Sequence, residues 1–376
     1  MGDISNMCLE SLLPTLECIR FHLRLIPEGI VETCNLRELA TPNGHVCARV
    51  NKAWHGLKQV GKIAHDDLVK RLDEAKCKKV GMVEGCFRHG SRPIDFALVV
   101  DDFLIECERD EDLEHLQNAM GKCHKFKVDL EVKQCAGINL NWDCEKRTVR
   151  LSMDGCVEQA LREFKFEAPS KPCHAPLRCT VPKCREKALD ESAPLSEEKI
   201  TFIQRVVGKL LCCARAVDPT MLHVVNDISL NAAKGTEATL DATVFLLNCA
   251  HTHPNAEIVC RKSDMTLWVD SDAPHLAAPE ARSRAGGCQC LSDEEGTIFN
   301  GPVLVPAKAI ENVMASATEA ELGAPFMDAQ EAVALCNCLE AVGFPQLPTP
   351  LKTDNNAANG VINNTMKQKQ WKAIDV

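Results

Sequence analysis

The sequence predicts an α/β (α+β) fold made of more than one structural unit. At 376 residues, the chain is longer than a typical single domain. Short apolar runs bounded by turn residues alternate with longer stretches in which apolar side chains recur at helical spacing. The clearest short run, residues 94–107, consists of two apolar strands joined by Asp101 and Asp102. Antiparallel hairpins interspersed with helices are typical of the α+β class.

The composition indicates a folded protein that stays inside the cell. Hydrophobic residues make up 45% of the chain and charged residues 26%, which is the balance of a globular protein. No apolar run approaches the roughly 18 residues of a membrane helix, and the N-terminus does not resemble a signal peptide. We therefore expect an intracellular protein, cytoplasmic or nuclear, without membrane contact. The net charge of -10 argues against nucleic-acid binding through bulk charge alone.

Cysteine is unusually abundant, with 22 residues, and tyrosine is absent. In a long chain without an export signal, free thiols are expected rather than disulfides. The densest group is a candidate zinc site made of Cys173, His174, Cys179 and Cys184. However, the C-x-x-C spacing that brings two thiolates to one zinc ion occurs nowhere in the chain. Scattered free thiols are therefore the favoured interpretation.

The N-terminal half is expected to contain strands, turns and two helices. Pro42-Asn43-Gly44 marks a hairpin turn. Residues 62–75 carry apolar side chains on one helical face, and residues 109–122 form a second helix. Strands are expected within residues 126–152.

The C-terminal half begins with a Pro- and Cys-rich stretch, residues 168–194, which we interpret as a linker. Residues 196–215 return to helical spacing, and further helix is expected to about residue 250. A strand that ends in acidic residues follows, then strands and turns, a helix at about 318–342, and a strand–Asp–helix unit around Asp354.

Two sets of carboxylates are candidate metal ligands. Asp101 and Asp102 lie at the tip of an apolar hairpin, where a divalent cation would relieve their repulsion. A solvated turn explains the same pattern, and the pattern alone favours it. In the C-terminal third, acidic residues at strand ends and at a helix start can converge on one edge of a sheet. They are Asp272, Glu321, Asp354 and Asp375.

Helix capping offers a simpler explanation for two members of the second set. Thr318 and Glu321 have the spacing of a capping box. Asp354, followed by two asparagines, can cap the next helix. Both explanations remain open from sequence alone.

Several motifs occur in a fixed order along the chain. They are WHGLKQVGK at 54–62, FALVVDDFLIE at 96–106, VGKLLCCARAVDPT at 207–220, and then VDSDA, ASATEAELGA, LKTDNNAA and KAID. In this order they resemble the reverse transcriptase and ribonuclease H region of a copia-type retrotransposon Pol polyprotein, over nearly the whole chain. The resemblance implies an RNA-directed DNA polymerase with hybrid-specific ribonuclease activity.

Carried over residue by residue, the resemblance implies a polymerase site at three aspartates. Asp3, Asp101 and Asp102 would bind the two Mg²⁺ (or Mn²⁺) ions that align a primer 3′ hydroxyl with the α-phosphate of a deoxynucleotide. Three further positions would contact the nucleotide, namely Cys8, Gly56 and Gln59.

The same resemblance implies a ribonuclease H site that cuts the RNA strand of an RNA–DNA hybrid. Its metal-binding residues would be Asp272, Glu321, Asp354 and Asp375. Asp270 competes with Asp272 for the first position, and Glu319 competes with Glu321 for the second.

The chain also departs from the family pattern. Cys8, His55 and Val99 stand where relatives carry aromatic residues, and Pro325 lies inside the expected helix that carries Glu321. An interior proline costs roughly 3 kcal/mol of helix stability. These departures indicate a decayed copy, so the alternative function is a catalytically dead remnant or a nucleic-acid-binding module without turnover.

The resemblance divides the chain into three regions. Residues 1–165 would form the palm and thumb with the fingers largely missing, 166–262 the connection, and 263–376 a mixed-sheet ribonuclease H domain cut short at its C-terminal end. The implied partners are an RNA template, a DNA primer, an RNA–DNA hybrid and deoxynucleotides. The sequence does not predict an oligomeric state.

Overall fold

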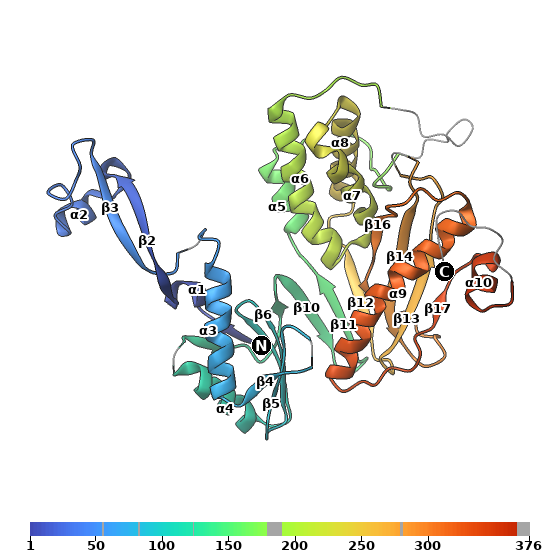
Figure 1. Cartoon of the computed structure of the whole chain (residues 1–376), viewed down its shortest axis with the longest axis horizontal. Helices are drawn as coiled ribbons and strands as arrows, with labels where there is room; N and C mark the ends of the chain where they lie inside the picture. The colour runs from blue at the N-terminus through green and yellow to red at the C-terminus, as the bar shows by residue number, and fades with distance from the viewer. Residues whose placement is uncertain (55, 82, 123, 179–189, 279–280, 367–376) are drawn as a thin grey trace. The chain divides into compact units, whose positions relative to one another are not determined.

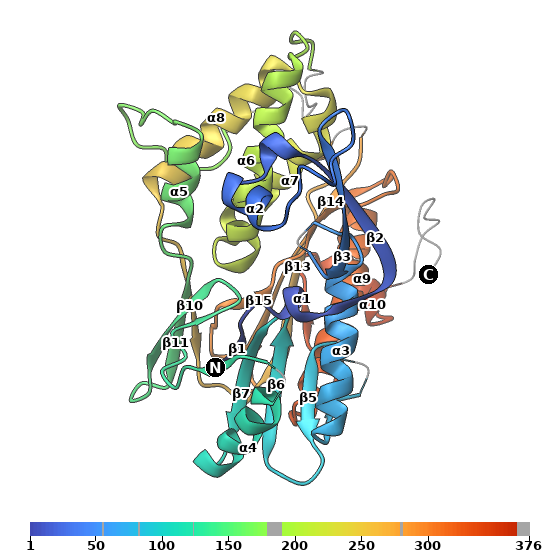
Figure 2. The same cartoon turned by 90° about the vertical axis from the view of Figure 1, so that its left-hand side faces the viewer.

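The chain forms two compact units, Met1–Val132 and Lys133–Val376 (Figures 1 and 2). The computed structural model describes residues 1–54, 56–81, 83–122, 124–178, 190–278 and 281–366. Helices and mainly antiparallel strands occur in both units, which confirms the α+β class. No helix within these ranges combines the length and the apolar character needed to cross a membrane.

The first unit is built on a six-stranded antiparallel sheet in the order β4-β5-β6-β7-β1-β8. The predicted hairpin at residues 94–107 is confirmed as β6 and β7. The strands are β1 (Gly2–Ile4), β4 (Cys77–Lys79), β5 (Cys86–His89), β6 (Ile94–Val99), β7 (Asp102–Cys107) and β8 (Phe126–Val128).

Two helices pack on this sheet, and both were predicted. They are α3 (Val60–Glu74) and α4 (Asp110–Gly121). Apolar side chains at helical spacing from both helices meet a row of phenylalanines from the sheet, because each helix buries one face. The contacting residues are Leu68, Leu72, Leu116, Met120, Phe87, Phe96 and Phe103.

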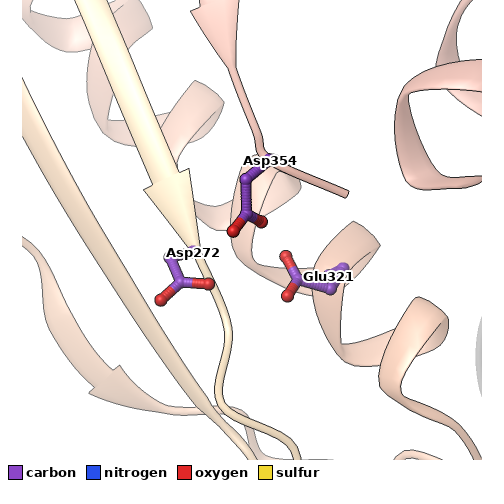
Figure 3. Close-up of side chains that lie close together, drawn as sticks. All are labelled: Asp272, Glu321 and Asp354. Atoms are coloured by element: carbon purple, nitrogen blue, oxygen red, sulfur yellow. The ribbon is translucent and has the colours of Figure 1, made fainter. Parts of the chain in front are cut away.

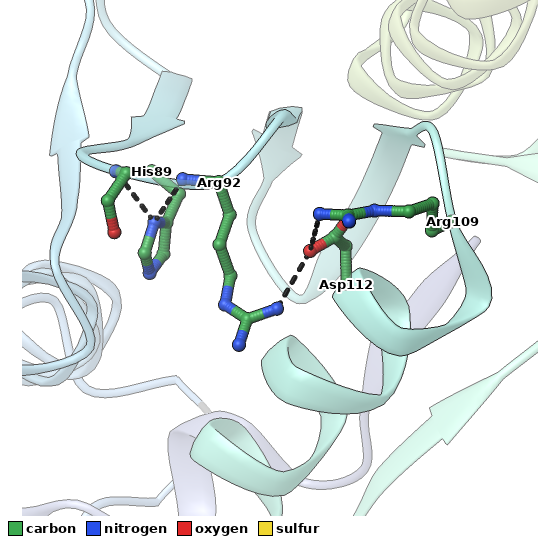
Figure 4. Close-up of polar contacts among 5 residues, drawn as sticks. His89, Arg92, Arg109 and Asp112 are labelled. Atoms are coloured by element: carbon green, nitrogen blue, oxygen red, sulfur yellow. Dashed lines mark hydrogen bonds and ion pairs between the residues drawn. The ribbon is translucent and has the colours of Figure 1, made fainter.

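A buried ion pair fixes the start of α4 (Figure 4). The fully buried carboxylate of Asp112 accepts hydrogen bonds from Arg92 at 2.8 Å and from Arg109 at 3.0 Å. Next to it, the imidazole of His89 accepts the backbone N–H groups of Ser91 and Arg92, both at 3.1 Å. Hydrogen bonding to Arg92 and then to Arg109 lowers the pKa of Asp112. Because the folded pKa lies below the unfolded one, this stabilisation is present at neutral pH and is lost in acid.

A two-stranded arm extends from α1 (Met7–Glu10) and is formed by β2 (Leu12–His22) and β3 (His45–Lys52). The connection between its strands contains η1 (Leu23–Leu25) and α2 (Glu28–Thr33). The predicted turn at Pro42-Asn43-Gly44 forms, since the N–H of Gly44 donates to the carbonyl oxygen of Thr41 at 2.8 Å. It does not join two strands directly, because it ends the long connection of residues 23–44 between β2 and β3.

The second unit begins with an antiparallel sheet and a group of helices. The sheet has the order β12-β11-β10-β9, and the helices bury one continuous apolar core. The elements are β9 (Gln134–Cys135), β10 (Ile138–Asp143), β11 (Thr148–Ser152), α5 (Cys156–Glu163), α6 (Glu197–Ala216), η3 (Pro219–Met221), α7 (Leu222–Asn231), η4 (Ala232–Lys234), α8 (Glu237–Thr252) and β12 (Glu257–Arg261).

A mixed sheet completes the second unit. Its order is β15-β14-β13-β17, with β16 also paired to β14, and β13 runs parallel to β17. The elements are β13 (Thr266–Asp272), β14 (Arg284–Ser292), β15 (Pro302–Leu304), β16 (Ala307–Ala309), α9 (Ala317–Ala341), β17 (Leu351–Lys352) and α10 (Asn356–Ile362). These bounds confirm the predicted helix at 318–342 and the strand–Asp–helix unit.

The two compact units divide after residue 132. The resemblance described above implied a boundary after residue 165 instead. Val157 and Leu161 of α5 are buried in one core with α6, α7 and α8, and β11 pairs with β12. Residues 133–165 therefore pack with the helices that follow them. Within the predicted linker, the described residues 168–178 and 190–194 contain no helix.

Helix α9 continues past Pro325, although proline lacks the N–H that would bond the carbonyl of Glu321. We expect Pro325→Ala to raise the free energy of unfolding, by up to about 3 kcal/mol, because it restores this bond and removes the clash of the ring. Urea unfolding measures the change. The matched variant Pro348→Ala lies in an exposed loop. It should lower the free energy of unfolding by at most about 1 kcal/mol, because the unfolded chain gains conformational freedom. A lower midpoint for Pro325→Ala would contradict the expected strain.

Candidate metal site

Three carboxylates converge at one edge of the mixed sheet (Figure 3). Asp272 ends β13, Asp354 follows β17, and Glu321 lies in the second turn of α9. One oxygen from each lies within 4.8 Å of the others. Because β13 and β17 are parallel neighbours, their carboxyl ends meet at the same edge. The structure thus brings together three of the four predicted ribonuclease H residues, and the fourth, Asp375, lies outside the described residues.

Small side chains allow α9 to approach the sheet closely enough to place Glu321 there. Ala320 and Ala324, on either side of Glu321, are fully buried against Ala273 and Ala285 of the sheet region. Larger residues at these positions would hold the helix away from the strands.

The structure also assigns the helix caps. Ser316 caps α9 by accepting the N–H of Glu319 at 3.1 Å, and the Glu319 carboxylate accepts the N–H of Ala315 at 2.7 Å. The predicted capping box of Thr318 and Glu321 is therefore wrong by two residues, and Glu319, the competitor of Glu321, serves the cap.

The start of α10 is also capped by a residue other than the predicted one. Asn355 accepts the N–H groups of Ala357 and Ala358, both at 3.0 Å, so Asp354 is not the capping residue. Asp270 lies two residues before Asp272 and lines the adjacent cleft without joining the three carboxylates.

Burial and mutual repulsion determine the electrostatics of the three carboxylates. Burial raises the pKa of Glu321, and the charges of Asp272 and Asp354 raise it further. Glu321 is 9% exposed, and its Oε2 atom has no hydrogen-bond partner among the described residues. Oxygen ligands from three carboxylates suit a hard divalent cation such as Mg²⁺ or Mn²⁺, which would both relieve the repulsion and occupy this unpaired oxygen.

A cleft of about 740 Å³ adjoins Asp272 and Asp354. Its walls include three basic side chains that sequence reasoning did not identify, namely His223 of α7, Arg284 of β14 and Lys352 of β17. The Lys352 ammonium lies 4.3 Å from the centre of the Trp268 ring, a cation–π contact.

Arg284 is nearly buried and forms an ion pair with Asp227 of α7. In the sequence, Arg284 stands directly before the small residues of β14. Nothing in that local pattern predicts a buried partner on a helix far away along the chain. The ion pair joins α7 to the strand that borders the cleft.

The polymerase-like aspartates lie on adjoining strands of the first unit. Asp3 of β1 is directly opposite Asp102 of β7, and the N–H of Ile4 donates to the carbonyl oxygen of Asp101 at 3.0 Å. Opposed residues on antiparallel strands project from the same face, where like charges repel. Within the described ranges, however, no three ligand atoms of this group lie within 4.8 Å of one another.

The turn beside these aspartates is strained. Val100 and Asp101 form a two-residue turn between β6 and β7, and Val100 has a positive φ of 59°. Glycine is preferred at the first position of such a turn, and a β-branched residue there is an outlier. Backbone strain of this kind is common at functional sites.

The three predicted nucleotide-contact residues lie near α1 and α3. Cys8 lies in α1 and packs against the core of the first unit. Gln59 precedes α3 and donates to Glu17 at 2.9 Å, and Gly56 has a φ of 99°. A hollow of about 460 Å³ beside the arm is lined by none of these three residues. His55 lies outside the described residues.

No protein-family model matches the sequence, and a search of curated proteins gave no match. Any functional assignment therefore depends on the residues and geometry described above.

The strain at Val100 can be measured directly. Val100→Gly should raise the free energy of unfolding by about 1 kcal/mol, because glycine adopts a positive φ without steric cost. Val99→Gly is the matched control, since Val99 is exposed and has ordinary strand geometry. That control should lower stability by roughly 0.5–1 kcal/mol. Equal losses in both variants, measured by urea unfolding, would contradict the strain.

The raised pKa of Glu321 predicts a pH dependence of stability. Above about pH 4.3, the usual pKa of glutamate, the unfolded chain ionises before the folded one, so stability falls as pH rises. Glu321→Gln should flatten this fall and exceed the parent in stability at pH 7 without divalent cations.

Thermal unfolding across pH measures this effect. Glu340→Gln, an exposed substitution on the same helix, should retain the parent's curve. Identical curves for Glu321→Gln and the parent would contradict a raised pKa.

Proposed function

We propose that this chain is the reverse transcriptase and ribonuclease H region of a copia-type retrotransposon Pol polyprotein. In this proposal the C-terminal residues hydrolyse the RNA strand of RNA–DNA hybrids in support of transposon DNA synthesis. The observation that carries the proposal is the convergence of Asp272, Glu321 and Asp354 from a strand, a helix and a second, parallel strand. The order of the sequence motifs supports it independently.

The positions of the three side chains suit phosphodiester hydrolysis. A divalent metal ion at these carboxylates would supply an activated water and stabilise the leaving oxygen. Asp272 and Asp354 are exposed, so a nucleic-acid backbone can reach them. Glu321 is nearly buried and lies on the side of the site that faces the protein interior. Lys352 and His223 line the adjoining cleft and can contact phosphate oxygens there.

For the first unit we propose the palm of an RNA-directed DNA polymerase. Its support is the cross-strand pairing of Asp3 with Asp102 and the strained turn that carries Asp101. The proposed substrates are a primed RNA template and deoxynucleotides, with Mg²⁺ or Mn²⁺ as cofactor.

The decisive experiment is cleavage of a labelled RNA–DNA hybrid by the full chain in Mg²⁺ and in Mn²⁺. Asp272→Asn should lower the rate by about 100-fold or more, because it removes a charged ligand that stabilises the transition state. Asp270→Asn, two residues away on the same strand, should retain most activity. The opposite result would assign the site to Asp270.

A folded chain without cleavage would overturn the ribonuclease proposal and favour the non-catalytic alternative. Circular dichroism and a cooperative thermal transition establish that the sample is folded. Binding of the uncut hybrid over a range of salt concentrations would then distinguish a nucleic-acid-binding module from an inert remnant.

A further inference from the structure

A short segment between α5 and α6 lies along one face of α8. Arg178 forms an ion pair with Asp241 at 3.4 Å, and its guanidinium lies 4.9 Å from the centre of the Phe245 ring. At the other end of the segment, the N–H of Cys173 donates to the hydroxyl of Thr252 at 2.9 Å. The segment therefore runs antiparallel to the helix and is attached at both ends.

This arrangement brings two cysteines and two histidines to the end of α8. Nδ1 of His174 lies 3.0 Å from Nε2 of His253. The bond from Cys173 to Thr252 places Cys173 beside the turn of α8 that carries Cys249, and the Cys173 thiol donates to the carbonyl oxygen of Ala175 at 3.2 Å. Cys249 and His253 are four residues apart, so they lie on one face at the C-terminal end of α8. The negative end of the helix dipole favours a cation at this position.

We propose that Cys173, His174, Cys249 and His253 form a binding site for a borderline-soft divalent cation of the Zn²⁺ type. Two thiolates and two imidazoles are a common ligand set for structural zinc. The proposal does not depend on the proposed function, because these residues do not include the acidic ligands. It replaces the cluster considered from sequence, whose members Cys179 and Cys184 lie outside the described residues.

The site requires some side-chain movement to close. Among the described residues, only Asp272, Glu321 and Asp354 place three ligand atoms within 4.8 Å of one another. The two imidazoles are exposed and bonded to each other, whereas Cys249 is buried at the helix surface. Rotation of His174 and His253 toward the thiols would bring the four ligands around one ion.

Cobalt is the suitable probe, because charge transfer from thiolate to Co²⁺ absorbs in the near ultraviolet and carboxylates give no such band. We expect the full chain, purified in reductant and freed of metal, to bind one Co²⁺ with this absorption and to release it on addition of Zn²⁺. His253→Ala should weaken binding by at least about 10-fold, since even indirect partners of a metal ligand contribute this much. Cys173→Ser should reduce the thiolate absorption per bound ion.

His251→Ala is the matched control, because His251 is exposed on the same helix and, two residues before His253, projects from a different side of it. It should bind Co²⁺ as the parent does. Parent-like affinity and absorption in both His253→Ala and Cys173→Ser would overturn the proposal and assign the metal to other cysteines of the chain. A Cys173–Cys249 disulfide that persists in reductant, with no metal uptake, would also overturn it.

Discussion

Repulsion among Asp272, Glu321 and Asp354 is the constraint on which the C-terminal part of the structure depends. Three carboxylates with oxygens within 4.8 Å destabilise the fold unless they are neutralised or bridged. Their positions are nevertheless fixed by ordinary packing, namely the parallel pairing of β13 with β17 and the close approach of α9 through small residues. Under the proposed function, a bound divalent cation would offset this repulsion.

The sequence predicted the elements well and their tertiary partners poorly. Apolar patterning located the β6–β7 hairpin, α3 and α6, because local apolar spacing determines all three. It could not decide between Glu319 and Glu321, since both fit a helix start and the cap depends on Ser316, whose role is visible only in three dimensions. The packing of residues 133–165 with later helices was missed for the same reason, because long-range contacts leave no local pattern.

Two departures from ideal backbone geometry lie beside the candidate sites. Val100 adopts a positive φ next to Asp101, and Pro325 leaves the carbonyl of Glu321 without its helical partner. In both places the surrounding packing maintains a conformation that the local sequence disfavours. Local rules therefore fail beside residues for which a function is proposed, but they also fail elsewhere, as at Val132 with a φ of 49°.

The net charge of -10 limits how such a chain could hold a polyanion. Arg284 is engaged with Asp227, which leaves Lys352 and His223 as the basic side chains of the cleft that can contact phosphates. Under the proposed function, divalent ions bridging carboxylates and phosphates would supply most of the local attraction. Hybrid affinity would then follow the divalent cation concentration more closely than the count of lysines and arginines, which governs basic nucleic-acid-binding proteins.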